Sequence, residues 1–217
     1  MLTKEKIDEN RKLFLKLLRS IQIPNCDIQG LEEFLDSSDF YHAPASTIYH
    51  ASYLGGLCEH SLNVWANLDR LCKTFYPNVY TSDEIKVVAL LHDLAKINYY
   101  EPYERKQKKY HDAGKMNDKN GMGNYDWETV LCFKVRNETE RMIFGTHGFN
   151  SFVLASRYIA LTEEQVAAIV NHHAGMDEES KAKDMTPIMN KYPLVTLLHM
   201  ADMLATYIDE RLVWINV

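Results

Sequence analysis

The sequence has no hydrophobic run long enough to cross a membrane, and its N-terminus, "MLTKEKIDENRKLFLKLL", is charged and periodic rather than like a signal peptide. It also has no excess of basic residues, since 24 Lys and Arg stand against 30 Asp and Glu, for a net charge of −6. A broad basic face for nucleic acid is therefore not expected, although a local basic pocket is compatible with this balance. These absences favour a cytoplasmic protein without a membrane partner.

Cysteines are few, and none form a Cys-x-x-Cys pair. The four of them are widely spaced along the 217 residues, at Cys26, Cys58, Cys72 and Cys132. This spacing predicts free thiols in a reducing compartment rather than a disulfide framework or a zinc site. Low-complexity tracts and internal repeats are also absent, so the length predicts one globular domain.

Apolar residues recur at helical spacing through most of the chain. They predict helices over residues 3–21, 31–38, 57–77, 81–97, 146–160, 161–175 and 192–212. Thr81 or Ser82 is the expected N-cap of the fourth helix, and residues 41–56 are rich in turn-forming residues. The predicted fold class is mainly α, a single-domain helical bundle.

Residues 99–126 differ from this pattern because they are polar, lysine-rich and rich in Gly and Asn. We expect them to form a long surface excursion, followed by a small hairpin between residues 127–135 and 141–145. The predicted organisation is N-terminal helices over 1–48 that pack on a main domain over 49–210, with the excursion at about 99–146 and a tail over 211–217.

Polar residues interrupt five of the apolar segments. They are His60, His92 with Asp93, His147, His172 and Asp202. Imidazole nitrogens and carboxylate oxygens are metal ligands, and helices of a bundle can each direct one such residue into the core. A single histidine of this kind is more often packed in a core or on the surface. Six such residues in one chain favour a shared metal site.

Five motifs in this order resemble a known family. "GGLCEHSLNVW", "LLHDLAK", "GTHGFNS", "IVNHHAG" and "LLHMADMLATYIDER" are similar to the signature of the HD-domain metal-dependent phosphohydrolases, from about residue 49 to 210. The closest pattern is that of the HD domain of YhaM-type 3′-5′ exoribonucleases and of small stand-alone HD proteins from bacteria and phages. The resemblance implies an HD-type helical bundle and one or two divalent transition metal ions.

The resemblance also implies a ligand set. His60, His92, Asp93 and Asp202 would bind a first ion, and His147 and His172 a second, with Asp93 bridging. His173 would lie just outside this set, and His199 matches no ligand position. The mixed imidazole and carboxylate ligands accept Mn²⁺, Fe²⁺, Co²⁺, Ni²⁺ or Zn²⁺ and argue against a site for Mg²⁺ alone.

Other residues near these motifs suit phosphate chemistry. Lys96 follows Asp93 by three residues, so it either binds phosphate or is a solvated lysine at a helix end. His173 and Glu59 are candidate proton donors, but Glu59 points about 100° away from His60 on a helix. Arg141 is a candidate contact to substrate, and Tyr99 is a candidate for stacking on a base.

Three functions are compatible with these motifs. The first is hydrolysis of a phosphoester bond, in a nucleotide or related small phosphate compound, by a metal-activated water. The second is a 3′-5′ exonuclease on short single-stranded RNA or DNA, with the lysines of "ERKQKKY" guiding the strand. The third is a non-catalytic HD protein that binds a nucleotide or a partner. The substrate itself and the oligomeric state stay open.

Overall fold

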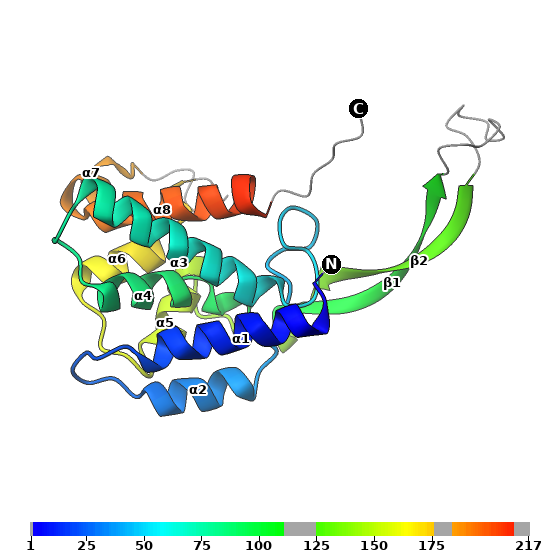
Figure 1. Ribbon diagram of the computed structural model, residues 1–217, viewed down its shortest axis with the longest axis horizontal. Coiled ribbons are helices and arrows are strands. Elements are labelled where there is room, and N and C mark those ends of the chain that lie inside the picture. Colours follow the sequence, from blue (N-terminus) through cyan, green and yellow to red (C-terminus); the bar gives the residue numbers. More distant parts are fainter. Residues whose placement is uncertain (1, 111–124, 176–183, 211–217) are drawn as a thin grey trace.

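Helices form most of the protein, as their apolar spacing predicts. The computed structural model describes residues 2–110, 125–175 and 184–210, which form a helical body with one projecting hairpin (Figure 1). The helices are α1 (Lys4–Arg19), α2 (Ile28–Asp36), α3 (Gly56–Phe75), α4 (Ser82–Leu91), α5 (His147–Ala155), α6 (Glu163–Val170), α7 (Thr186–Lys191) and α8 (Pro193–Leu204). Two short 3₁₀ helices accompany them: η1 (Leu94–Lys96) follows α4, and η2 (Glu138–Glu140) precedes α5. A π-helix, η3 (Ala205–Asp209), continues α8.

Threonine side chains start several of these helices. Thr81 caps α4, where its hydroxyl accepts a hydrogen bond from the Glu84 N–H and the Glu84 carboxylate accepts one from the Thr81 N–H. Thr162 and Gln165 form the same reciprocal pair at the start of α6. Such capping boxes satisfy backbone N–H groups that a helix leaves unpaired, so they define where α4 and α6 begin.

The core has two parts that meet along α3 and α4. Phe14, Leu31 and Leu57 are buried in the first part, which brings α1 and α2 against α3 and α4. Val64 and Leu198 are buried in the second part, which packs α3 and α4 against α6 and α8. Helix α3 lies between α1 and α8 (Figure 1). The mainly α bundle predicted from the sequence is confirmed, whereas the domain boundary at residue 48 stays a prediction.

Helix α4 ends earlier than its pattern predicts. We expected one helix over 81–97, but the regular helix ends at Leu91, His92 is its C-cap, and Asp93 adopts φ −111° and ψ 20° before the turn η1. Adjacent residues on an α-helix point about 100° apart. The break after α4 lets His92 and Asp93 direct their side chains toward the same point.

The region expected to be a loop contains a long strand. Strand β1 (Tyr100–Tyr110) pairs antiparallel with β2 (Tyr125–Val135), from Tyr100 opposite Val135 to Tyr110 opposite Tyr125. The predicted surface excursion is confirmed, but its first part is a strand, and the predicted pairing of 127–135 with 141–145 is wrong. The strand partners are complementary, as in the ion pair of Glu101 with Lys134. Residues 111–124, which complete the predicted loop, lie outside the described residues.

The N–H groups of Phe144 and Gly145 are used elsewhere, which explains why the end of the segment 141–145 does not form the expected strand. The Asn150 side-chain oxygen accepts hydrogen bonds from the Phe144 and Gly145 N–H groups, both at 2.8 Å. Met142 packs against the first core. A short helix that the pattern did not predict, α7, precedes α8 and carries Pro187 in its first turn.

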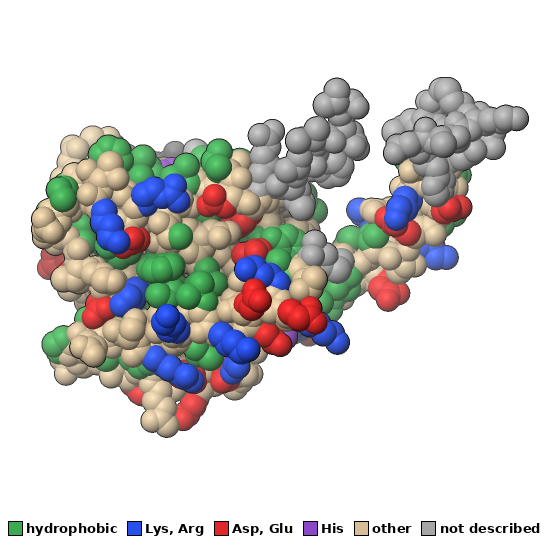
Figure 2. All heavy atoms as spheres, viewed as in Figure 1, with side chains coloured by type: hydrophobic (Ala, Val, Ile, Leu, Met, Phe, Trp, Pro, Cys, Tyr) green, Lys and Arg blue, Asp and Glu red, His purple; other side chains and the backbone are tan. Residues whose placement is uncertain are grey.

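The distribution of surface charges and the state of the cysteines agree with the expectations from the composition. Figure 2 shows basic and acidic side chains interspersed on the visible face of the body and the hairpin, with no large patch of one sign. All four cysteines are free, as predicted. Among the described residues, no helix combines the length and the apolar character that a membrane span requires.

Gly148 allows α5 to approach the end of α6 closely, which gives a test of the fold. A Cβ at this position would lie 2.3 Å from the Val170 carbonyl oxygen, so Gly148→Ala forces the two helices apart. We expect a loss of about 1–3 kcal/mol in the free energy of unfolding, measured by urea denaturation. Gly145→Ala is the control, because its Cβ meets only the movable Phe149 side chain. Equal stability of the two variants would contradict the close packing.

Candidate metal centre

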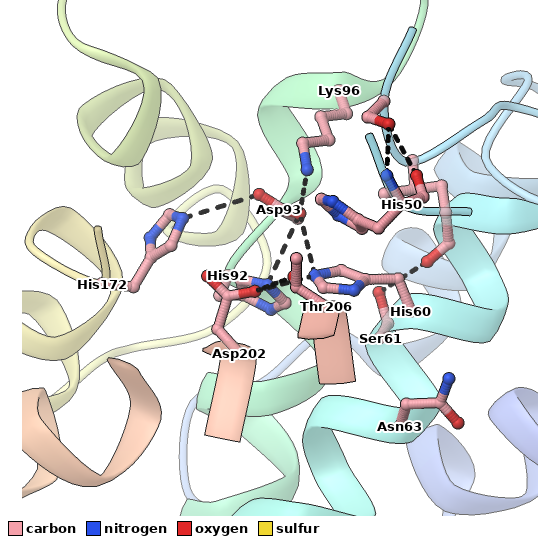
Figure 3. Close-up of polar contacts among 12 residues, drawn as sticks. His50, His60, Ser61, Asn63, His92, Asp93, Lys96, His172, Asp202 and Thr206 are labelled. Atoms are coloured by element: carbon pink, nitrogen blue, oxygen red, sulfur yellow. Dashed lines mark hydrogen bonds and ion pairs between the residues drawn. The ribbon is translucent and has the colours of Figure 1, made fainter. Parts of the chain in front are cut away.

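The six predicted ligands converge in the interior of the bundle, although they come from distant parts of the chain. Figure 3 shows His60, His92, Asp93, His172 and Asp202 together, and Nε2 of His147 lies 2.6 Å from Asp93 Oδ1. Helix α3 contributes His60, the end of α4 contributes His92 and Asp93, and α8 contributes Asp202. His147 is the first residue of α5, and His172 lies in the turn after α6. His60, His92, Asp93 and His172 are almost completely buried. The sequence-based grouping therefore corresponds to one cluster in space.

Asp93 lies at the middle of this cluster, and its two carboxylate oxygens face different partners. Oδ2 lies 3.5 Å from Nε2 of His60, 3.5 Å from Nε2 of His92 and 2.6 Å from Nζ of Lys96. Oδ1 lies 2.6 Å from Nε2 of His147 and 3.6 Å from Nε2 of His172. This division is what a carboxylate that bridges two cations requires.

Three histidines turn the same ring nitrogen toward Asp93. Nδ1 of His92 donates to the Ala89 carbonyl oxygen at 2.8 Å, and Nδ1 of His172 donates to the Ile169 carbonyl oxygen at 2.7 Å. Nδ1 of His60 donates to the Glu210 carboxylate at 3.0 Å. Each ring is thus oriented through Nδ1, which is the usual arrangement of histidines that bind metals through Nε2.

Among the described residues, the buried Nε2 atoms of these three rings make no hydrogen bond, although that of His60 faces Asp202 Oδ1 at 3.2 Å. An unpaired buried polar atom costs free energy, so three of them pointing at one place call for a group that they can bind. Among the described residues, four sets of nitrogen and oxygen atoms lie close enough to hold a cation. One of them, His50, His60 and Glu210, lies on the far side of the His60 ring, and the other three lie at this place. These three sets are His60, His92 and Asp93; His92, His172 and Asp202; and Asp93, His147, His172 and His173. Imidazole and carboxylate ligands suit divalent transition metal ions.

The charges of the cluster favour a cation as well. Burial raises the pKa of Asp93, but Lys96 and the neighbouring histidines outweigh it and hold this pKa well below its usual value. Burial lowers the pKa of His60, but the Glu210 and Asp202 carboxylates outweigh it and raise this pKa to about 10. The carboxylates therefore stay ionised and attract positive charge, either a proton or a metal ion.

Lys96 is a buried residue rather than a solvated lysine at a helix end. Only 9% of it is exposed, and its Nζ lies 2.6 Å from Asp93 Oδ2. Burial lowers the pKa of Lys96, but the Asp93 carboxylate outweighs this effect and the net pKa is raised. Lys96 is thus a permanent positive charge beside the cluster.

His173 stacks parallel to His147, with ring centroids 5.0 Å apart. Burial, with the nearby His172 and His147, lowers the pKa of His173 to about 3. The ring is therefore neutral near pH 7, which suits a metal ligand or a hydrogen-bonding residue better than the proton donor suggested by the sequence. The other candidate donor, Glu59, accepts a hydrogen bond from the Tyr53 hydroxyl at 2.5 Å.

Two residues that the sequence analysis did not select belong to the cluster. Glu210 is buried, and its carboxylate accepts a hydrogen bond from His60 Nδ1 and another from the Asn63 side-chain amide, each at 3.0 Å. The His50 ring lies 4.8 Å from the His60 ring, and its buried Nε2 makes no hydrogen bond within the part of the chain that the structure describes. A histidine in a loop and a glutamate near the chain end carry no spacing signal, so only the packing reveals them.

Arg141 and Tyr99, the other predicted substrate contacts, meet each other. Nη1 of Arg141 donates to the Tyr99 hydroxyl at 2.9 Å, and its guanidinium lies 4.9 Å from the centre of the Tyr99 ring. Neither residue is among those that line the cavity beside the cluster. Their role in substrate binding stays a prediction.

A cavity of about 360 Å³ opens beside the cluster. Among the described residues it is lined by Tyr49, His50, Lys96, His173, His199, Asp202, Met203, Thr206 and Tyr207. Its size is within the range of small-molecule sites. His199 takes part as a support, because its Nδ1 donates to the His172 carbonyl oxygen at 2.8 Å.

The bundle and its centre define a helical protein with His and Asp side chains arranged for divalent metal ions. Comparison with protein families identifies the class: the HD domain matches residues 57–207, more than half of the chain. The protein therefore belongs to the HD domain family, whose members are in general metal-dependent phosphohydrolases. No curated protein and no solved structure matches the chain.

The ligand roles stay a prediction that metal analysis can test. We expect Asp93→Ala to lose all bound metal, because its two oxygens face both groups of histidines. His147→Ala should lose only the ion on the Oδ1 side, if two ions bind. The measurement is metal per chain by mass spectrometry after loading with Mn²⁺ or Co²⁺, with the exposed His42→Ala as the control. Full metal content in Asp93→Ala would rule out Asp93 as the bridge.

Proposed function

We propose that the protein hydrolyses a phosphoester bond in a nucleotide or a related small phosphate compound. One observation carries the proposal: the cavity beside the cluster is lined by Asp202, a predicted metal ligand, and by Lys96, whose Nζ lies 2.6 Å from Asp93 Oδ2. Metal ligands alone would suit a structural site. A cavity and a buried positive charge beside them suit the binding of an anion.

The residues that would hold the cations are those of the three donor sets, with Asp93 shared between two of them. Bound divalent cations at such a site lower the pKa of water and offset charge on phosphoryl oxygens. The chain needs no serine or cysteine nucleophile for this chemistry. Among the free thiols, Cys58 and Cys72 are buried away from the cavity lining.

Lys96 supplies the positive charge that the chain itself brings to the phosphate. An ammonium group has three N–H donors, and Asp93 occupies one of them at 2.6 Å. Because Lys96 also lines the cavity, a remaining donor can bind a phosphoryl oxygen there. Asp93 holds Nζ in place, so the contact needs little reorganisation when the substrate binds.

Replacing Lys96 tests this role. We expect Lys96→Met to lower kcat about 100-fold or more, with metal still bound, in a screen of nucleotides and model phosphoesters with Mn²⁺ or Co²⁺. Lys86→Met is a matched control, because Lys86 is equally buried and pairs with Asp83 three residues earlier at 2.9 Å, in the same way that Lys96 pairs with Asp93.

Two results would contradict the proposal. Unchanged kinetics in Lys96→Met would remove Lys96 from the reaction. Metal-loaded wild-type protein that binds nucleotides but hydrolyses nothing in the screen would favour the third function, a non-catalytic binding protein.

One face of the hairpin favours a second candidate function, a 3′-5′ exonuclease on short single strands. Cross-strand pairs share a face, and alternate pairs lie on the same side. Lys108 with Trp127 and Tyr110 with Tyr125 therefore lie on one side, and Lys108 Nζ is 4.1 Å from the centre of the Tyr125 ring. Aromatic rings with lysines between them suit stacked bases and a phosphate backbone.

Digestion of a labelled single-stranded oligonucleotide tests for exonuclease activity, and titration of the same oligonucleotide measures its affinity for the protein. We expect Trp127→Ala to weaken oligonucleotide binding roughly 5- to 100-fold, and the affinity of the wild-type protein to fall as salt rises. Tyr103→Ala is the control, since Tyr103 is an exposed aromatic residue on the opposite face of the hairpin. Equal losses in both variants, or binding independent of salt, would count against a strand on this face.

A further inference from the structure

Exposed apolar side chains gather at the mouth of the cavity beside the metal centre. Tyr49 is 77% exposed and Tyr207 is 60% exposed, and both line the cavity. Their sequence neighbours Ile48 and Ile208 are exposed as well. Single exposed apolar residues are common, but two exposed tyrosines from separate segments that line one cavity indicate a surface that a ligand covers.

The loop that carries Tyr49 is ordered by one serine. Ser46 Oγ accepts hydrogen bonds from the Tyr49 and His50 N–H groups, both at 3.0 Å, and donates one to the His50 carbonyl oxygen at 2.6 Å. The His50 side chain extends from this loop toward Asp93 and His60 (Figure 3). Ser46 thus orders the backbone of Tyr49 and His50 at the mouth of the cavity.

The backbone that carries Tyr207 is also ordered. Tyr207 lies in η3, the π-helix that extends α8 between Asp202 and Glu210. The Glu210 N–H donates to the Ala205 carbonyl oxygen at 2.9 Å, and the Glu210 carboxylate binds His60. Short π-helical turns often occur at functional sites, because they redirect the side chains that follow.

The cavity therefore has two chemically different ends. Lys96 and His50 lie at the inner end, next to Asp93 (Figure 3). Tyr49 and Tyr207 lie at the outer end, and Met203 and Thr206 contribute to the wall. A ligand that matches both ends carries an anionic group and a planar, largely apolar group.

We propose that Tyr49 and Tyr207 form a nucleobase-binding subsite at the mouth of the cavity. The phosphate of the same ligand reaches the inner end, so this part of the inference rests on the proposed function. The ligand class is then a nucleotide rather than a phosphoester without a base. Aromatic rings stack on any base, so the subsite selects for a base without selecting which one.

The test measures binding rather than turnover. The probes are adenosine 5′-phosphonate, whose C–P bond resists hydrolysis, and methylphosphonate, which lacks the nucleoside. Their dissociation constants for the metal-loaded wild-type protein are measured by isothermal titration calorimetry. We expect adenosine 5′-phosphonate to bind roughly 10-fold or more tightly than methylphosphonate, since stacking of this kind corresponds to roughly 5- to 100-fold in affinity.

Variants of the two tyrosines then locate the effect. Tyr49→Ala and Tyr207→Ala should each remove much of the preference for the nucleoside while leaving methylphosphonate binding unchanged. Tyr49→Phe and Tyr207→Phe should keep the preference, because the ring is retained. Tyr76→Ala is the matched control, since Tyr76 is a partly exposed tyrosine that lines a different cavity, beside Phe75 and Met200.

The outcomes separate this inference from the proposed function. Equal affinity for the two probes in the wild-type protein would overturn the subsite, even if phosphoesters are hydrolysed. A preference that depends on Tyr49 and Tyr207 would support the subsite even if no hydrolysis occurs. Absence of binding for both probes would overturn both proposals.

Discussion

The buried carboxylate of Asp93 is the group on which the rest of the centre depends. An ionised carboxylate removed from water costs several kcal/mol unless positive or hydrogen-bonding groups surround it. Lys96 and His147 contact it at 2.6 Å, and His60, His92 and His172 face it at 3.5–3.6 Å. Because these partners come from α3, α4, α5 and the end of α6, the charge of one residue requires most of the bundle to be assembled.

The supporting contacts are as important as the ligands. The backbone carbonyl groups of Ala89 and Ile169 and the Glu210 carboxylate each hold one histidine by Nδ1. The early end of α4 directs His92 and Asp93 to the same point, which a continuous helix cannot do. These features orient donor atoms before any ion binds, so a cation meets a site that needs little rearrangement.

Much of this organisation could be predicted from the sequence, and the errors have identifiable causes. The apolar periodicity predicts the helices, and His60, His92, Asp93, His147, His172 and Asp202 stand out as polar residues in apolar segments. The lysine-rich segment of β1 carries no strand signal of its own, because its stability comes from cross-strand partners in β2. Glu210 and His50 cannot be identified from the sequence pattern, because their place in the cluster depends on their contacts with His60.

The sequence by itself determined the helical class, the HD family and the set of candidate ligands, because these follow from local periodicity and from the order of short motifs. The tertiary structure alone decided which oxygen of Asp93 faces which histidine, that Lys96 is buried, and that Tyr49 and Tyr207 share a cavity. The physical reason is that distances between residues far apart in the chain depend on how helices pack, and side-chain packing over the whole core sets them.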